Sequence, residues 1–398
     1  MKIKLTALVL AFILCLTISM PCFETVSAAT QGTYYETAVG LLSKIGVLEE
    51  NSPENFNVDK NMTRAEFVVM LLKAKGIQTM ATPEVSFFTD VEISNWAAGY
   101  INAAVDMGMI NGYPDGSFKP NNNISIFECI KLAVDTANYG FQTEGKGGYP
   151  SAYLSVGWDI GISSGLEDIS DRPATAGEAA LITFHMLETN WMIRGSHNGM
   201  EKYTEDKTRT MLSEVFGIYK GKGIMSGTEE TRLSNPSGVG KGEVEISGRS
   251  YELGDSNAKK FLGYSVRFYY KNGKDNSNDE LIYVSGDSKN DDIVVKSTEI
   301  ESFENLTYRY YTNMDESSMI ATVKVSATSD IIYNGKALIG AKDDSLFIPK
   351  SGNVILIDNN GDGICDVVKI NNKNLMLVES VDKSNYIIYD QLVAGNKV

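Results

Sequence analysis

Histidine and cysteine are scarce in this chain of 398 residues, and their scarcity argues against several chemistries. The two histidines, His185 and His197, belong to neither a zinc motif nor a recognisable catalytic triad. The sequence also lacks a G-x-S-x-G motif, a phosphate-binding loop and a nucleophilic cysteine motif. Acidic residues are abundant, so a carboxylate pair for glycoside cleavage stays open, although nothing singles one out. We therefore expect a protein that is not an enzyme.

Only four cysteines are present, and two of them lie among the first 29 residues. The remaining pair, Cys129 and Cys365, is widely separated, and we expect two buried thiols rather than a disulfide. An exported protein with so few cysteines depends on an ordinary hydrophobic core instead of covalent cross-links.

Long apolar runs are absent after the N-terminus. Residues 5–18 form one such run, which follows two lysines and precedes the small residues of positions 26–29. This pattern predicts a signal peptide over residues 1–29 and hence a secreted protein. The run is too short for a comfortable membrane span, and no later segment is apolar enough to form one.

Basic residues are outnumbered by acidic ones, which gives a formal net charge of −15. Such an acidic surface argues against binding to nucleic acid or to an anionic membrane. An anionic ligand remains compatible with it, provided that the site that binds it is locally basic.

An internal repeat organises the first half of the chain. A set of five residues recurs 62 positions later, pairing Gly46 with Gly108, Phe56 with Phe118, Met62 with Ile124, Thr63 with Ser125 and Glu66 with Glu128. A weaker third copy contains Gly161, Thr175 and Glu178. Repeats of this length indicate stacked units, none of which can bury its apolar face alone.

Each copy is predicted to form a helix, a loop and a second helix. Apolar residues recur at helical spacing from Tyr35 to Ile45, and Gly46 ends this first helix. The second helices begin with S/T-x-x-E capping boxes at Thr63, Ser125 and Thr175, so the three glutamates are interpreted chiefly as caps. Between the helices of copy two, residues 113–116 (Tyr-Pro-Asp-Gly) predict a tight turn.

Several motifs add to this skeleton: Phe88-Thr-Asp-Val91, Trp96, a loop over residues 111–116 (Asn-Gly-Tyr-Pro-Asp-Gly), and Thr63-Arg-Ala-Glu66. With them the chain resembles the S-layer homology family over roughly residues 30–195. The resemblance implies three repeats in a compact pseudo-trimeric spindle, whose grooves hold a pyruvylated secondary cell-wall polysaccharide.

The resemblance also implies roles for individual residues. Arg64 would meet an acidic group of the polymer, for which its planar fork is suited; the alternative is a pair with a local acid. Trp96 would offer its face to a sugar or else lie in the core, and Asp90 would accept hydroxyl hydrogen bonds or cap the following segment. Gly112 and Tyr113 would set the loop that walls the groove.

The later copies depart from the family pattern. Ile126 and Ala176 replace arginine at the positions equivalent to Arg64. We therefore expect at most one competent groove, completed by Arg64 of copy one together with Asp90 and Trp96 of copy two.

Beyond residue 215 the pattern changes to short β-branched and aromatic runs separated by Gly, Asn and Asp, which predicts an antiparallel all-β region. The fold class is therefore α+β and multidomain, with an all-α N-terminal part. The boundaries that we predict are a signal peptide at 1–29, repeats at 30–80, 81–142 and 143–195, a linker at 196–214 and the β-rich region at 215–398. That region forms either one irregular barrel or sandwich, or two subdomains that meet near 285–305.

A polar loop within this region offers a metal-site candidate. Asp358, Asn360, Asp362 and Asp366 occupy the first, third, fifth and ninth positions of a calcium loop, with Gly363 at the sixth. Lys369 stands where an EF-hand has its bidentate glutamate, and strands rather than helices are predicted on both sides. A Ca²⁺ site and a metal-free hairpin turn both remain open.

Together these features predict a secreted, non-enzymatic protein of the cell wall or S layer. Its helical repeats would dock on wall polysaccharide without a required cofactor, and its β-rich region would serve structure, assembly or adhesion, with other surface proteins as further partners. The alternatives are a wall-anchored glycan-active enzyme with carboxylates in the β-rich region, and a scaffold for protein assembly only.

Overall fold

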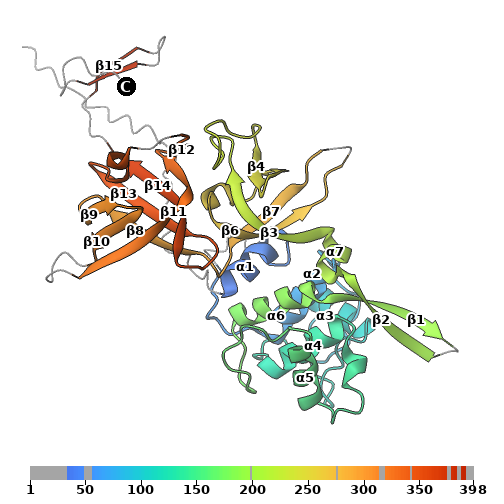
Figure 1. Cartoon of the computed structure of the whole chain (residues 1–398). Helices are drawn as coiled ribbons and strands as arrows, with labels where there is room; N and C mark the ends of the chain where they lie inside the picture. The colour runs from blue at the N-terminus through green and yellow to red at the C-terminus, as the bar shows by residue number, and fades with distance from the viewer. Residues whose placement is uncertain are drawn as a thin grey trace, which may run out of the picture.

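The structure is a computed structural model that describes residues 34–48, 56–197, 200–274, 277–312, 319–340, 343–373, 378–382 and 387–390. The predicted signal peptide lies outside these residues. Within them, no helix is both long and apolar enough to cross a membrane. A helical module comes first along the chain and a β-rich region follows it (Figure 1).

The helical module contains the two-helix units expected from the repeats. Its helices are α1 (Tyr34–Lys44), α2 (Arg64–Ala74), α3 (Ala98–Asp106), α4 (Ile126–Thr136), α5 (Ser151–Asp159) and α6 (Ala176–Glu188), with a 3₁₀ turn η2 (Gly140–Thr143). Gly46, Gly108 and Gly161 follow α1, α3 and α5 with φ of 75°, 69° and 83°. This left-handed conformation ends a helix and favours glycine, which explains the repeated residue.

The three predicted capping boxes are confirmed. The side chains of Thr63, Ser125 and Thr175 each accept the backbone N–H three residues on, and the glutamate at that position accepts the N–H of the cap in return. Each cap contributes roughly 1 kcal/mol to its helix.

The extended residues just before the second helices join the repeats in a ring. Met62 N–H donates to the Ala174 carbonyl at 2.9 Å, Ala174 N–H to the Ile124 carbonyl at 2.9 Å, and Ile124 N–H to the Met62 carbonyl at 3.0 Å. Every repeat thus donates to one neighbour and accepts from the other. The ring brings all three helix N-termini to one end of a shared core.

The predicted linker at 196–214 is wrong. The strands β1 (Asn190–His197) and β2 (Met200–Thr210) pair antiparallel as a hairpin, and α7 (Met211–Phe216) follows β2 directly. Trp191, Met192 and Tyr203 of the hairpin pack against the helical core, and so does α7. Because many of the hairpin's other residues are charged, its sequence shows little of the apolar alternation by which strands are recognised.

The region from residue 218 onward forms two units. The first is a closed barrel in the order β3-β4-β5-β7-β6, made of β3 (Ile218–Gly227), β4 (Glu243–Ile246), β5 (Arg249–Glu252), β6 (Ser265–Lys271) and β7 (Glu280–Gly286), with a 3₁₀ turn η3 (Ala258–Phe261).

The second unit is a sheet in the order β8-β13-β14-β11-β10-β9, with β12 paired to β11. Its strands are β8 (Asp291–Lys296), β9 (Ile300–Glu304), β10 (Thr307–Tyr311), β11 (Ile320–Tyr333), β12 (Lys336–Ala337), β13 (Gly352–Asp358) and β14 (Ile364–Asn372), with a 3₁₀ turn η4 (Asp344–Phe347). A further hairpin pairs β15 (Val378–Asp382) with β16 (Ile387–Asp390).

The expectation of purely antiparallel strands is also wrong, because β11 runs parallel to β14 and β5 parallel to β7. One face of the sheet shares a core with the barrel, in which Ile355, Ile357 and Val367 join Val266 and Val284. The barrel and the sheet are therefore packed against each other through this shared core.

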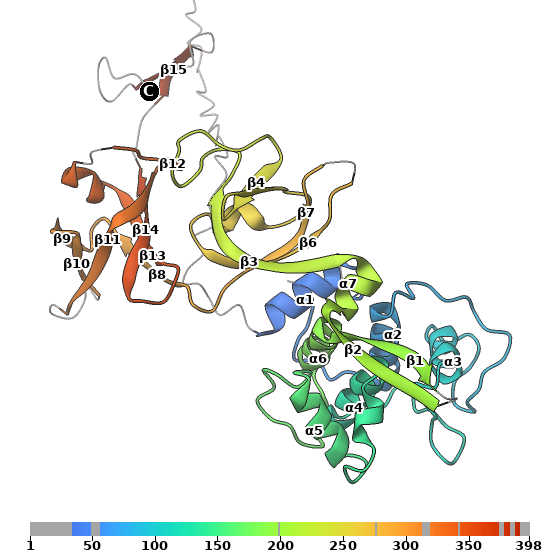
Figure 2. The same ribbon diagram turned by 45° about the vertical axis from the view of Figure 1, so that its right-hand side comes forward.

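The barrel also packs against the helical module, as Figure 2 shows around α1 and α7. Tyr283 of β7 lies across Gly40 of α1, where a Cβ atom would overlap its ring, and its hydroxyl donates to the Glu36 carbonyl at 3.2 Å. Beside it, the hydroxyl of Tyr269 donates to the Glu188 carboxylate of α6 at 3.1 Å. This α1–barrel interface ties the two regions together.

Candidate functional site

Arg64, the first residue of α2, connects the first two repeats. Its Nε donates to the Phe118 carbonyl at 3.0 Å, and its Nη1 lies 2.7 Å from a carboxylate oxygen of Glu128, the cap of α4. The guanidinium also lies 4.9 Å from the Tyr113 ring centroid, and only 11% of the side chain is exposed. A cation at a helix N-terminus opposes the helix dipole, and the glutamate across the repeat boundary compensates for it.

The loop that follows α3 adopts the predicted turn. Gly116 N–H donates to the Tyr113 carbonyl at 3.0 Å, and Gly112 has a φ of 70°, with the Phe88 ring lying where a Cβ would be. Asp90 fixes the end of this loop, because its two oxygens accept the N–H groups of Phe118 and of the next residue at 2.8 Å. These bonds join Asp90 to a segment far along the chain and not to the one directly after it, and its role toward sugar hydroxyls stays a prediction.

Trp96 does not meet Arg64, and the expectation that both complete one groove is wrong. The indole precedes α3, is 58% exposed, and lines a separate pocket of about 200 Å³ together with Lys60, Glu66 and Lys73 of repeat one. The cause is the packing of α3 against α2, which carries the residues before α3 to the side of α2 away from α4. The exposure also excludes a core role for Trp96.

Arg64 instead lines a cavity of about 580 Å³, the wall groove candidate, whose size is typical of small-ligand sites. It is bounded by repeats one and two and by the hairpin, and its walls include Arg64, Gly112, Phe118, Glu128, Lys131, Asp135, Phe141, Tyr153 and Tyr203. Lys131 pairs with Asp135 at 2.8 Å and lies 5.1 Å from the Tyr153 ring centroid. The groove thus combines two cations with aromatic surfaces.

Several of these groove residues escaped the sequence analysis. Glu128 was interpreted as a cap, which it is, but its second role in holding Arg64 depends on contact between repeats. Lys131 lies two residues beyond Cys129 on α4, and the i,i+4 spacing to Asp135 was the only local signal for it. Tyr203 comes from the predicted linker, whereas Phe141 and Tyr153 lie in the predicted repeats, where no motif identified them.

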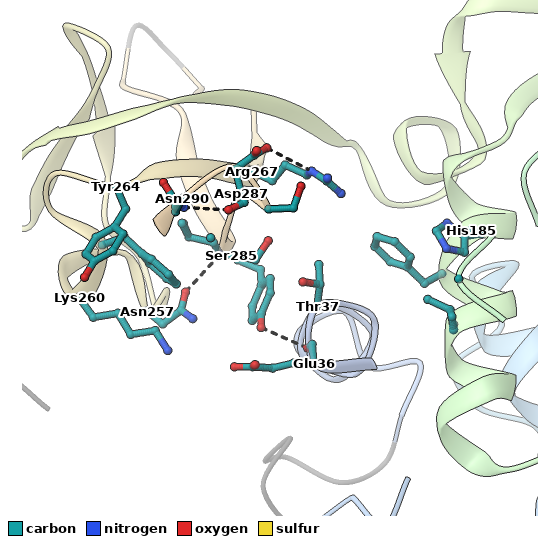
Figure 3. Close-up of a pocket in the computed structure, with 18 of the residues that line it drawn as sticks. Glu36, Thr37, His185, Asn257, Lys260, Tyr264, Arg267, Ser285, Asp287 and Asn290 are labelled. Atoms are coloured by element: carbon teal, nitrogen blue, oxygen red, sulfur yellow. Dashed lines mark hydrogen bonds and ion pairs between the residues drawn. The ribbon is translucent and has the colours of Figure 1, made fainter. Parts of the chain in front are cut away.

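A second cavity, of about 320 Å³, lies at the α1–barrel interface (Figure 3). Arg267 and Asp287 of the barrel face it, and Asp287 also pairs with Lys222 at 2.9 Å. His185 of α6 lines the opposite wall; burial lowers its pKa, so the imidazole is neutral near pH 7. Arg267 and Lys222 share the Asp287 carboxylate, and we assign no ligand chemistry to this cavity.

The side-chain oxygens of the calcium-loop candidate accept hydrogen bonds within the turn, and Ca²⁺ binding there stays a prediction. Both oxygens of Asp358 accept backbone N–H groups of the turn, from residues 360, 361 and 363, and Asn360 and Asp362 cap N–H groups in the same way. Asp366 accepts from Asn359 N–H at 3.0 Å. Nowhere in the described part of the chain do three His, Cys, Asp or Glu side chains gather as metal ligands. The loop is a hydrogen-bonded hairpin turn.

The two mature cysteines are confirmed as buried free thiols. Burial raises the pKa of the Cys129 thiol well above its ordinary value and that of Cys365 to about 12. A thiol with so high a pKa is a poor nucleophile, so both serve packing.

The helical module thus consists of capped repeats closed by a backbone ring, with a groove lined by two ion-paired cations and by aromatic rings. A profile of the S-layer homology domain matches residues 29–68 and 87–125, which cover parts of the first two repeats and include Arg64. The chain therefore carries S-layer homology domains. The third repeat lies outside the matched residues, although the structure gives it the same cap and ring contacts.

Relatives extend the similarity beyond the repeats. A surface layer protein of Brevibacillus choshinensis is 25% identical over 73% of this chain and 28% of its own length. A cell surface protein of Thermoanaerobacter kivui is 26% identical over 91% of this chain and 42% of its own length. An endoglucanase of Bacillus sp. (strain KSM-635) is 33% identical, but over only 23% of this chain and 10% of the enzyme.

The chain thus spans less than half of each of these relatives. The domain match and the two surface proteins place it among the surface proteins associated with the bacterial cell wall.

Proposed function

We propose that the helical module anchors this protein non-covalently to a secondary cell-wall polysaccharide, with its three repeats acting as a pseudo-trimeric spindle. The wall groove candidate carries the proposal, because Arg64 and Lys131 line one cavity of ligand size, and Arg64 lies within the matched family residues. The β-rich region then faces outward as a structural, assembly or adhesive surface, and other surface proteins are its partners. No chemical step and no cofactor is required.

The ligand chemistry follows from the two cations. An acidic substituent such as a pyruvate ketal presents a carboxylate, which a guanidinium binds with charge-assisted hydrogen bonds. Glu128 already holds Nη1 of Arg64, so the ligand carboxylate competes with it for the guanidinium. Glu128 keeps its bond from the Ser125 N–H during this exchange, and the capped helix stays intact. Lys131 supplies a second cation without a role between repeats.

Sedimentation of the mature protein with wall sacculi tests the anchoring. We expect co-sedimentation that is lost when the wall polymer is stripped, and at least tenfold weaker binding for Arg64→Ala and Lys131→Ala. Lys296→Ala is the matched control, since Lys296 forms an i,i+3 pair with Glu299 on the distant sheet as Lys131 does with Asp135 on α4. Lys131→Ala separates ligand binding from the structural role of Arg64.

Two results would overturn the proposal. If the protein sediments equally with stripped and intact sacculi, the repeats do not bind the wall polymer. A scaffold for protein assembly would then be the better interpretation. Release of reducing sugars or muropeptides by the purified protein would make it a wall-active enzyme.

A further inference from the structure

The β1–β2 hairpin is fastened to the helical module beside the wall groove candidate. The carboxylate of Glu205 on β2 accepts hydrogen bonds from the Tyr139 hydroxyl at 3.2 Å and from the Asn190 amide at 2.8 Å. Tyr139 is itself fully buried at the end of the second repeat. These contacts fix the position of β2 along the module rather than leaving the hairpin as a free arm.

The hydrogen bonds of Glu205 also fix the position of Tyr203, whose ring lines the groove. Tyr203 lies two residues before Glu205 and therefore on the same face of the strand. Its ring stacks on Phe141 of η2, with centroids 4.9 Å apart and planes 8° from parallel. Both rings line the groove, and Phe141 is 37% exposed. A stacked aromatic pair, with Phe141 partly exposed, therefore lies on the groove together with the cations.

Polar groups surround this stacked pair. Asp135 and Lys131 lie on α4, Tyr153 lies on α5, and Asn138 follows α4 on the same cavity wall. A sugar ring has an apolar face of C–H groups and a rim of hydroxyls, so it suits an aromatic surface edged with hydrogen-bonding groups. The cavity, at about 580 Å³, extends from these residues to Arg64.

We propose that Phe141, Tyr203 and Tyr153 form a second saccharide subsite, which binds the sugar adjacent to the acidic unit at Arg64. The inference rests on the proposed anchoring function and adds to it. All three residues lie outside the matched stretches 29–68 and 87–125. The subsite therefore combines residues of the second repeat, the third repeat and the hairpin, and it would let the site recognise two adjacent sugars rather than one acidic group.

Titration calorimetry with wall polymer, hydrolysed and separated into single repeat units and longer fragments, tests the subsite. The wild type should bind longer fragments about tenfold more tightly than single units, the value of one stacked ring at roughly 1.4 kcal/mol. Tyr203→Ala and Phe141→Ala should each remove that gain and leave the affinity for single units unchanged. Tyr203→Phe should retain it.

Tyr219→Ala is the matched control, because Tyr219 is a 40% exposed strand tyrosine that contacts another ring, Tyr270, on the distant barrel. Equal wild-type affinity for both fragment classes, or full fragment affinity in Tyr203→Ala and Phe141→Ala, would overturn the subsite. If Tyr203→Ala unfolds the hairpin, the affinity of Phe141→Ala for longer fragments tests the subsite instead.

The failure of the anchoring function looks different from the failure of the subsite. If the wild type does not bind the wall polymer at all, both the anchoring function and the subsite are refuted. Binding lost in Arg64→Ala but unchanged in the two aromatic variants refutes the subsite alone.

Discussion

Replacing Gly40 by alanine tests the packing of the α1–barrel interface. In the middle of a helix alanine is favoured over glycine by about 1 kcal/mol. Here the new methyl group would overlap the Tyr283 ring, which is only 7% exposed and is held by its bond to the Glu36 carbonyl. Overpacking of this kind costs about 1–3 kcal/mol. We therefore expect Gly40→Ala to lower the free energy of unfolding by up to about 2 kcal/mol.

Gly40→Ala should change the free energy of unfolding in the opposite direction when the Tyr283 ring has been removed. In a Tyr283→Ala background only the helix preference remains, so Gly40→Ala should stabilise by about 1 kcal/mol. Urea unfolding followed by tryptophan fluorescence is suited to this double-mutant cycle, because all three tryptophans lie in the helical module and its hairpin, at Trp96, Trp158 and Trp191. An equal effect of Gly40→Ala in both backgrounds would refute the proposed packing.

Three further predictions concern the groove loop, a cap and the polar turn. Gly112→Ala should cost about 1–3 kcal/mol more than Gly108→Ala, since both have a φ near 70° but only Gly112 lies against other atoms; equal losses of melting temperature would contradict this. Burial alone would raise the pKa of Glu178, but its hydrogen bonds, chiefly from Arg172, lower it overall, so stability present above about pH 4.5 is lost as pH falls through the folded value. Urea titrations should therefore show a shallower acid loss in Glu178→Gln. Asp358→Ala should lower the melting temperature equally in Ca²⁺ and in chelator, and a loss confined to Ca²⁺ would instead support the metal site.

The repeat architecture could be predicted because its signals are local. A capping box at Thr63 or Ser125 satisfies backbone groups within one helical turn, and Gly46 or Gly108 adopts a conformation that other residues resist. Such residues determine helix ends whatever surrounds them. The boundaries of the helices therefore followed from the sequence to within a few residues.

The partners across repeats could not be predicted in this way. The contact of Arg64 with Glu128 spans 64 positions, and nothing near either residue specifies it. The separation of Trp96 from Arg64 likewise depends on how α3 packs on α2. The hairpin was missed because Tyr203 and Met192 give it too few apolar positions, and the parallel strands because pairing direction depends on tertiary topology.

The α1–barrel interface has a mechanical consequence for a protein held by its helical module. Between α7 and β3 the chain has a single residue, Gly217. Tyr283 of β7 makes a second connection, because it packs on α1 and donates to the Glu36 carbonyl. A force on the barrel is therefore transmitted to the helical module both through the chain at Gly217 and through the packed α1–barrel interface. Under the proposed anchoring function, the barrel would therefore keep a fixed position relative to the wall-bound helical module.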